Sequence, residues 1–97
     1  MEQDLDAVLV ERGKRYGTFV RHAAVTQQLK LVMKQHKRDN HGHAAWRDLS
    51  DDQREALEMI VHKIGRILNG DPDYSDSWHG IAGYAKLVAD RLDGKVR

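Results

Sequence analysis

The sequence contains no cysteine, a single proline, few aromatic residues and no long apolar run. Without cysteine, the chain cannot form a disulfide scaffold, a thiolate zinc site, an iron–sulfur cluster or a cysteine nucleophile. No apolar run approaches the ~20 residues that cross a bilayer, and the acidic residues Glu2 and Asp4 argue against a signal peptide. We therefore expect one cytoplasmic domain over residues 1–97, without membrane contact.

The net charge of +1 conceals an uneven distribution of charge along the chain. The stretch from Arg12 to Arg38 holds eight Lys and Arg residues and no Asp or Glu, whereas residues 39–97 hold eight basic and eleven acidic residues. A protein that binds duplex nucleic acid would need a larger basic excess and a recognition helix, and the pattern reveals no such helix. Nucleic acid is therefore not an expected partner.

Apolar periodicity predicts helices along most of the chain and no strands. The clearest helix begins at a capping box formed by Ser50 and Gln53, and Gly70 follows it as a predicted left-handed cap. Helices are expected over about 4–12, 18–35, 51–69 and 75–92, with a mobile loop over 36–48. Because short connections favour antiparallel neighbours, we predict an all-α fold, a small four-helix and mostly antiparallel bundle with a C-terminal helical hairpin.

Three glycines interrupt the predicted helices. Gly65 lies within the third helix, and Gly80 and Gly83 lie within the fourth, where each costs up to ~1 kcal/mol relative to alanine. We interpret them as sites where the third and fourth helices approach each other closely. The alternative is a ligand groove along the hairpin.

Basic residues cluster around two glycines near the predicted end of the first helix. Backbone N–H groups, three cations and one aromatic ring in this segment could receive a phosphate or a nucleotide. Two cations three residues apart on the third helix could converge on the same anion. The predicted phosphate- or nucleotide-binding residues are Arg12, Lys14, Arg15, Tyr16, Lys63 and Arg66. The alternative is a set of scattered surface cations.

Acidic residues on the predicted hairpin form a second candidate site. Glu55, Glu58 and His62 follow i, i+3, i+7 spacing, and Asp76 opens the next helix. Oxygen ligands from two facing helices are a common way for bundles to bind Mg²⁺ or Mn²⁺. The predicted metal residues are Glu55, Glu58 and Asp76, and Mg²⁺ is the candidate cofactor. The alternative is an exposed face in which Glu58 and His62 form an ordinary helical pair.

Several segments together resemble a known family. These are ERGKRYG at 11–17, QREALEMI at 53–60, KIGRILNGDP at 63–72, and DSW at 76–78 followed by IAGYA at 81–85. They resemble a family of small phage and prophage proteins of unknown function. That family is distantly similar to the MazG-type all-α nucleoside triphosphate pyrophosphohydrolases. The resemblance implies a homo-oligomer in the cytoplasm of a bacterial host.

The same resemblance implies metal-binding roles for Glu55, Glu58 and Asp76. It also implies a loss, because the family usually has Asp before the IAGYA segment and this chain has Gly80. The predicted second helix has no acidic residue. We therefore expect a phage or prophage accessory protein that acts by binding either a nucleotide-type phosphate or a host protein. In the second case it would inhibit a host defence or CRISPR system. The alternatives are a Mg²⁺-dependent nucleoside triphosphate pyrophosphohydrolase and a module that pairs with another chain.

Overall fold

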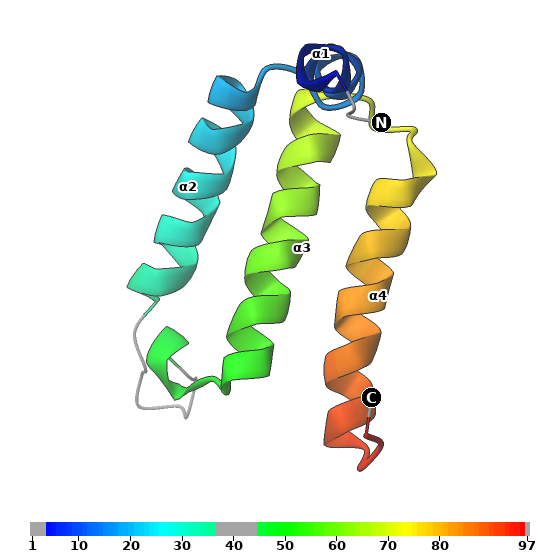
Figure 1. Ribbon diagram of the computed structural model, residues 1–97. Helices are drawn as coiled ribbons and strands as arrows, with labels where there is room; N and C mark the ends of the chain where they lie inside the picture. The colour runs from blue at the N-terminus through cyan, green and yellow to red at the C-terminus, as the bar shows by residue number, and fades with distance from the viewer. Residues whose placement is uncertain (1–3, 37–44, 97) are drawn as a thin grey trace.

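The computed structural model describes residues 4–36 and 45–96, which form helices joined by short turns (Figure 1). The predicted all-α fold and its C-terminal hairpin are confirmed. No helix in these two ranges is long and apolar enough to cross a membrane. The helices are α1 (Leu5–Tyr16), α2 (Phe19–Gln35), the short 3₁₀ helix η1 (Trp46–Asp48), α3 (Asp51–Asn69) and α4 (Ser75–Leu92).

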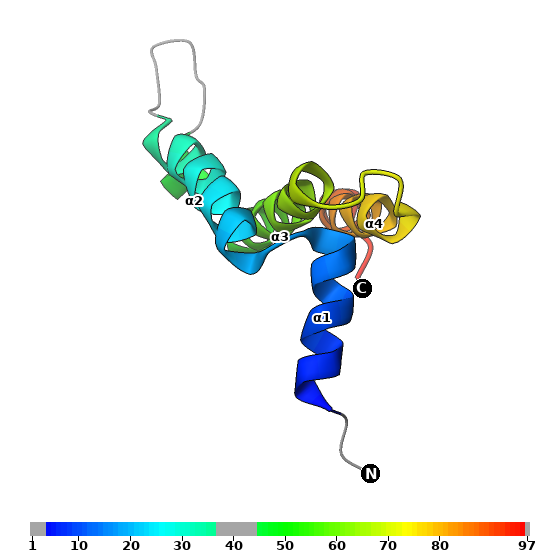
Figure 2. The same cartoon turned by 90° about the horizontal axis from the view of Figure 1, so that it is seen from above.

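The three longest helices form a single layer. Helix α3 lies in the middle and packs against α2 on one side and against α4 on the other (Figure 1). Helix α1 meets one end of this layer and projects away from it on one side (Figure 2). The chain therefore has an open shape, with extents of 51 × 31 × 26 Å.

Local signals fix the start of α3 and join it to the end of α4. The predicted capping box is present: the Gln53 N–H donates to Ser50 Oγ over 3.4 Å, and the Ser50 N–H donates to Gln53 Oε1 over 2.9 Å. The Arg91 guanidinium donates to both carboxylate oxygens of Asp52 over 2.7 Å, which lowers the pKa of that carboxyl. These contacts close the hairpin at the end away from its turn.

The boundaries of the first helix and the cap of the third differ from the predictions. Helix α1 continues to Tyr16, past the predicted end at residue 12, and Gly13 lies inside it. Gly70 has φ −131°, so it is not the left-handed cap that the sequence predicts. Within the predicted loop 36–48, η1 forms near its end, and residues 37–44 lie outside the described ranges.

The helical glycines have different neighbours from those expected. Gly65 faces α2, because a Cβ on it would lie 2.6 Å from Thr26 Cγ2. It therefore permits the close approach of α2 and α3, and not that of α3 and α4. Gly80 leaves room for the Lys63 side chain, whose Cε would lie 2.8 Å from an added Cβ, and Gly83 has no such neighbour within 4 Å.

Alanine substitutions at two of these glycines should change stability in opposite directions. Gly65→Ala forces the buried Thr26 and His22 aside and should lower the free energy of unfolding by about 1–3 kcal/mol. Gly83→Ala adds a methyl group in open space and should raise the free energy of unfolding by up to ~1 kcal/mol. Urea unfolding followed by circular dichroism measures both changes. Stabilisation by Gly65→Ala would contradict the described packing of α2 on α3.

Candidate phosphate-binding site

Two chain turns cross at the end of α3 and hold α1 in place. The Asn69 side-chain amide donates to the carbonyl oxygens of Tyr16 and Thr18, both over 2.9 Å. The Asp71 N–H donates to the Arg15 carbonyl over 2.7 Å. Gly17, between α1 and α2, has φ +76°, a backbone conformation that favours glycine. The last turn of α1 is thereby fixed against α3 and the turn before α4.

Arginine and tyrosine side chains alternate across this junction. The Arg66 guanidinium of α3 lies 4.2 Å from the centre of the Tyr16 ring, and the Arg15 guanidinium lies 4.5 Å from that of Tyr74. The two tyrosine rings are 6.2 Å apart. A guanidinium that lies over an aromatic ring contacts it through the flat face of the guanidinium. The N–H groups at the edge of the guanidinium can still bind an anion. The contacts thus orient two arginines without using their hydrogen-bond donors.

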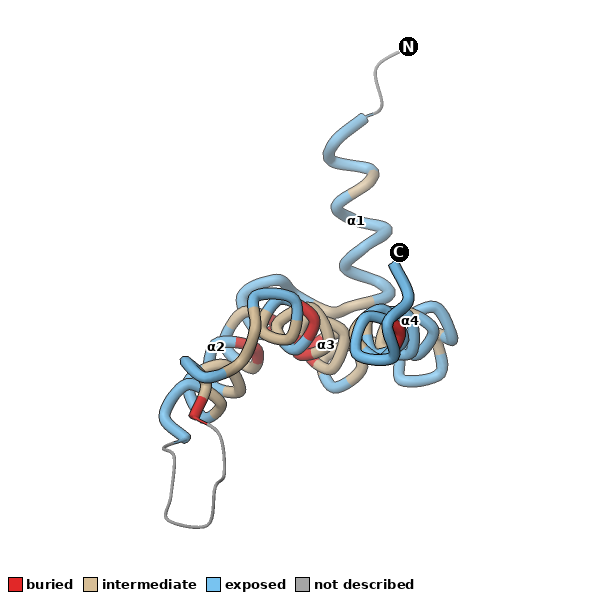
Figure 3. Tube along the Cα trace, turned by 90° about the horizontal axis from the view of Figure 1, so that it is seen from below, coloured by how far each residue is buried: buried red, intermediate tan, exposed pale blue. Residues whose placement is uncertain are grey.

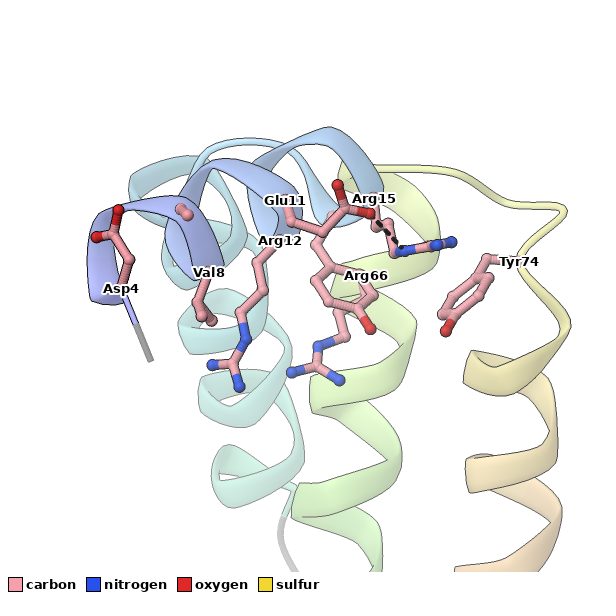
Figure 4. Close-up of a pocket in the computed structure, with 9 residues that line it drawn as sticks. Asp4, Val8, Glu11, Arg12, Arg15, Arg66 and Tyr74 are labelled. Atoms are coloured by element: carbon pink, nitrogen blue, oxygen red, sulfur yellow. Dashed lines mark ion pairs between the residues drawn. The ribbon is translucent and has the colours of Figure 1, made fainter. Parts of the chain in front are cut away.

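Two clefts flank α1 and share three of the predicted residues, Arg12, Tyr16 and Arg66. The first cleft, of about 500 Å³, lies on the α4 side of α1 and also includes Arg15 and Tyr74 (Figure 4). The second, of about 750 Å³, lies where α1 meets α2 and α3. The three shared residues therefore separate two adjoining spaces.

Arg12 and Arg66 have no ion-pair partner among the described residues, although Asp4 and Glu11 also line the first cleft. Arg15 forms an ion pair with Glu11, with its Nε 3.3 Å from the carboxylate oxygen. Among residues 4–36 and 45–96, no carboxylate lies within ion-pair distance of Arg12 or Arg66. Figure 4 shows their side chains extending from α1 and α3 in the same direction, beneath α1. Two guanidinium groups without carboxylate partners form an anion-binding arrangement.

The second cleft has a more apolar and aromatic lining. Leu9 and Phe19 contribute to it, and the Phe19 side chain is 76% exposed. His22 and His62 also line it, with His22 Nε2 3.2 Å from His62 Nδ1. Burial, with the charge of Arg66 as the next cause, lowers both histidine pKa values, that of His62 to about 4. Both imidazoles are therefore neutral near pH 7, and the cleft offers flat, uncharged surfaces beside the two arginines.

The structure brings four of the six predicted phosphate-binding residues together. Arg12, Arg15, Tyr16 and Arg66 line the first cleft. Lys14 lines neither cleft, because its position on α1 is turned away from them. Lys63 lies along Gly80 between α3 and α4, so it does not reach the anion-binding arginines.

The three predicted metal residues are not brought together. Glu58 faces α2, where its Oε1 lies 3.3 Å from Lys34 Nζ. Glu55 lines a separate cleft with Tyr84 near the C-terminal half of α4, whereas Asp76 lies in the first turn of α4. In the part of the chain that the structure describes, no group of three acidic or histidine side chains is placed to hold a metal ion.

Sequence reasoning missed several contributors to the two clefts, among them Leu9, Phe19, His22 and Tyr74. Phe19 follows the apolar periodicity of the predicted second helix, and the sequence favours an ordinary helix-boundary role for His22. Tyr74 lies in the turn before α4, and only the crossing of the two turns brings it to Arg15. The one usable signal is the tyrosine beside Asp73, because an aromatic residue in an exposed polar turn needs a packing partner.

Comparison of the chain with protein-family models, with curated proteins and with solved structures found no match. The resemblance to phage proteins therefore stays a prediction.

Proposed function

We propose that this protein binds a nucleotide-type ligand, with its phosphates between Arg12 and Arg66 and its base in the second cleft. The observation that carries this proposal is the pair of arginines at the boundary of two clefts, which have no ion-paired carboxylate among residues 4–36 and 45–96. Guanidinium groups bind phosphate oxygens through two parallel hydrogen bonds, and they stay charged at all physiological pH values. An anionic group with several oxygens is the ligand that best suits this pair.

The second cleft supports a ligand that also carries a flat ring. Phe19 offers an exposed aromatic face, Leu9 an apolar contact, and the neutral His22–His62 pair a polar but uncharged surface. Stacking on an aromatic face contributes about 1–3 kcal/mol per base in nucleic-acid proteins. A nucleoside phosphate satisfies both clefts at once, whereas inorganic phosphate occupies only the arginines.

The proposal is one of binding without hydrolysis. Glu55, Glu58 and Asp76 lie in three different surroundings, and metal-dependent transfer of phosphoryl groups needs carboxylates that converge on the ion. Pyrophosphate release from a nucleoside triphosphate in Mg²⁺, abolished by Glu58→Ala, would contradict this part of the proposal. The prediction of a host protein as ligand is separate and is tested by capture experiments.

Thermal unfolding in the presence of nucleoside mono-, di- and triphosphates, free nucleosides and inorganic triphosphate tests the proposal. A ligand at 100 times its Kd should stabilise the fold by ~2.7 kcal/mol. We expect at least one nucleoside phosphate to stabilise the fold and inorganic triphosphate to stabilise it less. Free nucleosides should not stabilise it. No shift with any phosphorylated compound would overturn the proposal.

Matched charge-removing variants locate the site. Arg66→Gln removes a cation shared by both clefts and should raise the Kd by about 10- to 100-fold. Lys14→Gln removes one positive charge from α1 at a position outside both clefts and should change the Kd less than about twofold. Titration calorimetry at fixed ionic strength measures both. Equal losses in the two variants would show general attraction to a basic surface and no defined site.

A further inference from the structure

The described part of the chain has almost no interior of its own. Its buried apolar residues are Ala45, Ala56 and Val61, and no large side chain within 4–36 and 45–96 is completely buried. Domains normally bury the apolar sides of two packed layers against each other. Here α2, α3 and α4 form one layer, and only scattered positions of the described residues are buried (Figure 3). The single layer leaves a whole side of these helices without a partner.

The chain exposes more surface area to solvent than a compact monomer of the same mass does. The chain exposes 7476 Å², whereas a compact monomer of 11.1 kDa exposes ~5,700 Å². Its radius of gyration is 16.2 Å, against ~12.5 Å for a compact domain of this length. Each chain therefore exposes about 1,800 Å² more than a self-contained domain of its mass. This excess is larger than the ~1,000 Å² per chain at which the interfaces of obligate homodimers begin.

One side of α3 and α4 is apolar and carries no charge. On α3, His62 and Arg66 point to the clefts beneath α1, Gly65 faces α2 and Lys63 faces α4. Helical periodicity then directs the remaining side away from α1. We call this the α3–α4 face: Leu57, Ile60, Ile64 and Leu68 from α3, and Trp78, Ala82, Ala85, Ala89 and Leu92 from α4. Exposed fractions of 67% for Leu68, 54% for Trp78 and 59% for Leu92 show how open it is.

We propose that a second copy of this chain covers the α3–α4 face, so that two single layers form one two-layer helical core. The two helices have complementary surfaces, because α3 presents large branched side chains and α4 presents three alanines. A two-fold axis parallel to the helices, between the layers, places α3 of each copy over α4 of the other. The large side chains of one then meet the small ones of the partner, and the stacked helices run antiparallel.

Helix α1 does not obstruct this arrangement. It leaves the layer on the opposite side (Figure 3), so the clefts that it borders stay open when the α3–α4 face is covered. That opposite side carries charged residues such as Glu55 and Arg66. Burial of such residues without partners is unfavourable, which makes it the less suitable side for a homodimer. The proposed assembly therefore does not depend on the proposed ligand.

Sedimentation equilibrium of matched glutamate variants tests the proposal. The wild-type chain should have at least twice the 11.1 kDa monomer mass at micromolar concentration. Ala85→Glu places a charge in the α3–α4 face, at a position that is exposed in the single chain, and should raise the dissociation constant at least ~100-fold. Leu87→Glu places the same charge on the other side of α4 and should leave the mass unchanged. A wild-type monomer, or an assembly that Ala85→Glu does not weaken, would overturn the proposal.

Tryptophan fluorescence gives a second readout that holds if Ala85→Glu fails to fold. In a Trp46→Phe variant, Trp78 is the remaining tryptophan and lies on the α3–α4 face. Its emission should shift to longer wavelength on dilution through the dissociation constant, together with a fall in Tm as the concentration falls. Emission and Tm that do not depend on concentration would contradict a second copy on this face.

Discussion

Gly17→Ala is expected to lower the free energy of unfolding by about 3 kcal/mol or more. Gly17 has φ +76° and ψ −169°, a region that only glycine occupies readily, and the backbone strain of another residue there is ~1–3 kcal/mol. A Cβ at this position would also lie 2.1 Å from the Asn69 carbonyl oxygen, which is backbone and cannot rotate away. Overpacking of this kind adds about 1–3 kcal/mol.

The loss should be concentrated at the junction of α1 with α3. The Asn69 amide holds the carbonyls of Tyr16 and Thr18, and both bonds depend on the close crossing of the two turns. Helix α1 has no buried residue of its own, so its last turn is fixed by these bonds, by the Asp71 N–H bond to the Arg15 carbonyl, and by the Arg66–Tyr16 and Arg15–Tyr74 contacts. We expect faster amide hydrogen exchange in α1 than in α3 when the crossing is disrupted.

Gly13→Ala is the matched control for this prediction. Gly13 also lies near the end of α1, but a Cβ on it would have nothing within 4 Å. Because alanine is the better helix former, the substitution should raise the free energy of unfolding by up to ~1 kcal/mol. Urea unfolding at one protein concentration compares the two variants. Similar effects at residues 13 and 17 would contradict the close crossing of the two turns.

The fold could be predicted from the sequence wherever local signals are strong. The bounds 51–69 and 75–92 are confirmed, because a capping box begins α3 and regular apolar spacing runs through both helices. The end of α1 could not be predicted, because a glycine within a helix costs little enough for neighbouring contacts to override it. Position 70 requires glycine because a Cβ there would lie 2.2 Å from the Arg15 carbonyl oxygen. Arg15 lies 55 positions earlier in the chain, so local sequence signals do not reveal this requirement.

The candidate site could be predicted in part for the same reason. Arg12, Arg15 and Tyr16 are neighbours in sequence, and helical spacing places Arg12 and Tyr16 on one side of α1. Spacing alone could not separate Arg66 from Lys63, which are three residues apart on α3. The structure separates them, because Lys63 fills the space above Gly80 while Arg66 lies over Tyr16. Which neighbour a helical side chain faces is a tertiary property, so residue type and spacing do not determine it.

Acidification from pH 7 to about 4 is expected to remove ~2 kcal/mol of stability through the His22–His62 pair. The two rings meet edge to face with centroids 4.6 Å apart, and their nitrogens are 3.2 Å apart, so the pair is stable while at least one ring is neutral. Protonation of both rings would place two cations in contact, close to Arg66, Lys63 and Lys30. Burial and these charges therefore lower the pKa of His62 from 6.5 to about 4.

The direction of the pH dependence follows from which state binds protons first. Between pH 6.5 and about 4, the unfolded chain protonates His62 and the folded chain does not. Falling pH therefore favours unfolding in this window, by about 1.4 kcal/mol per pH unit for each proton. Because His62 is partly exposed, solvent screening reduces the total to ~2 kcal/mol. The hydrogen bond from Arg91 holds the pKa of the Asp52 carboxyl below its usual 3.8. Protonation of this carboxyl therefore causes a further loss of stability at lower pH.

Urea unfolding at a series of pH values, with His62→Asn beside the wild type, measures this contribution. The asparagine amide can bond to His22 Nε2 from the position of Nδ1 without titrating, so the variant should lose most of the slope between pH 6.5 and 4. His79→Asn is the control, because His79 is exposed on α4 and its replacement should keep the wild-type slope. A slope that His62→Asn leaves unchanged would show that other titrating groups cause the acid sensitivity. A reduced slope would assign the acid sensitivity to the His22–His62 contact, which joins α2 to α3 and lines the second cleft. Proton binding there would then change the ligand site and the stability together.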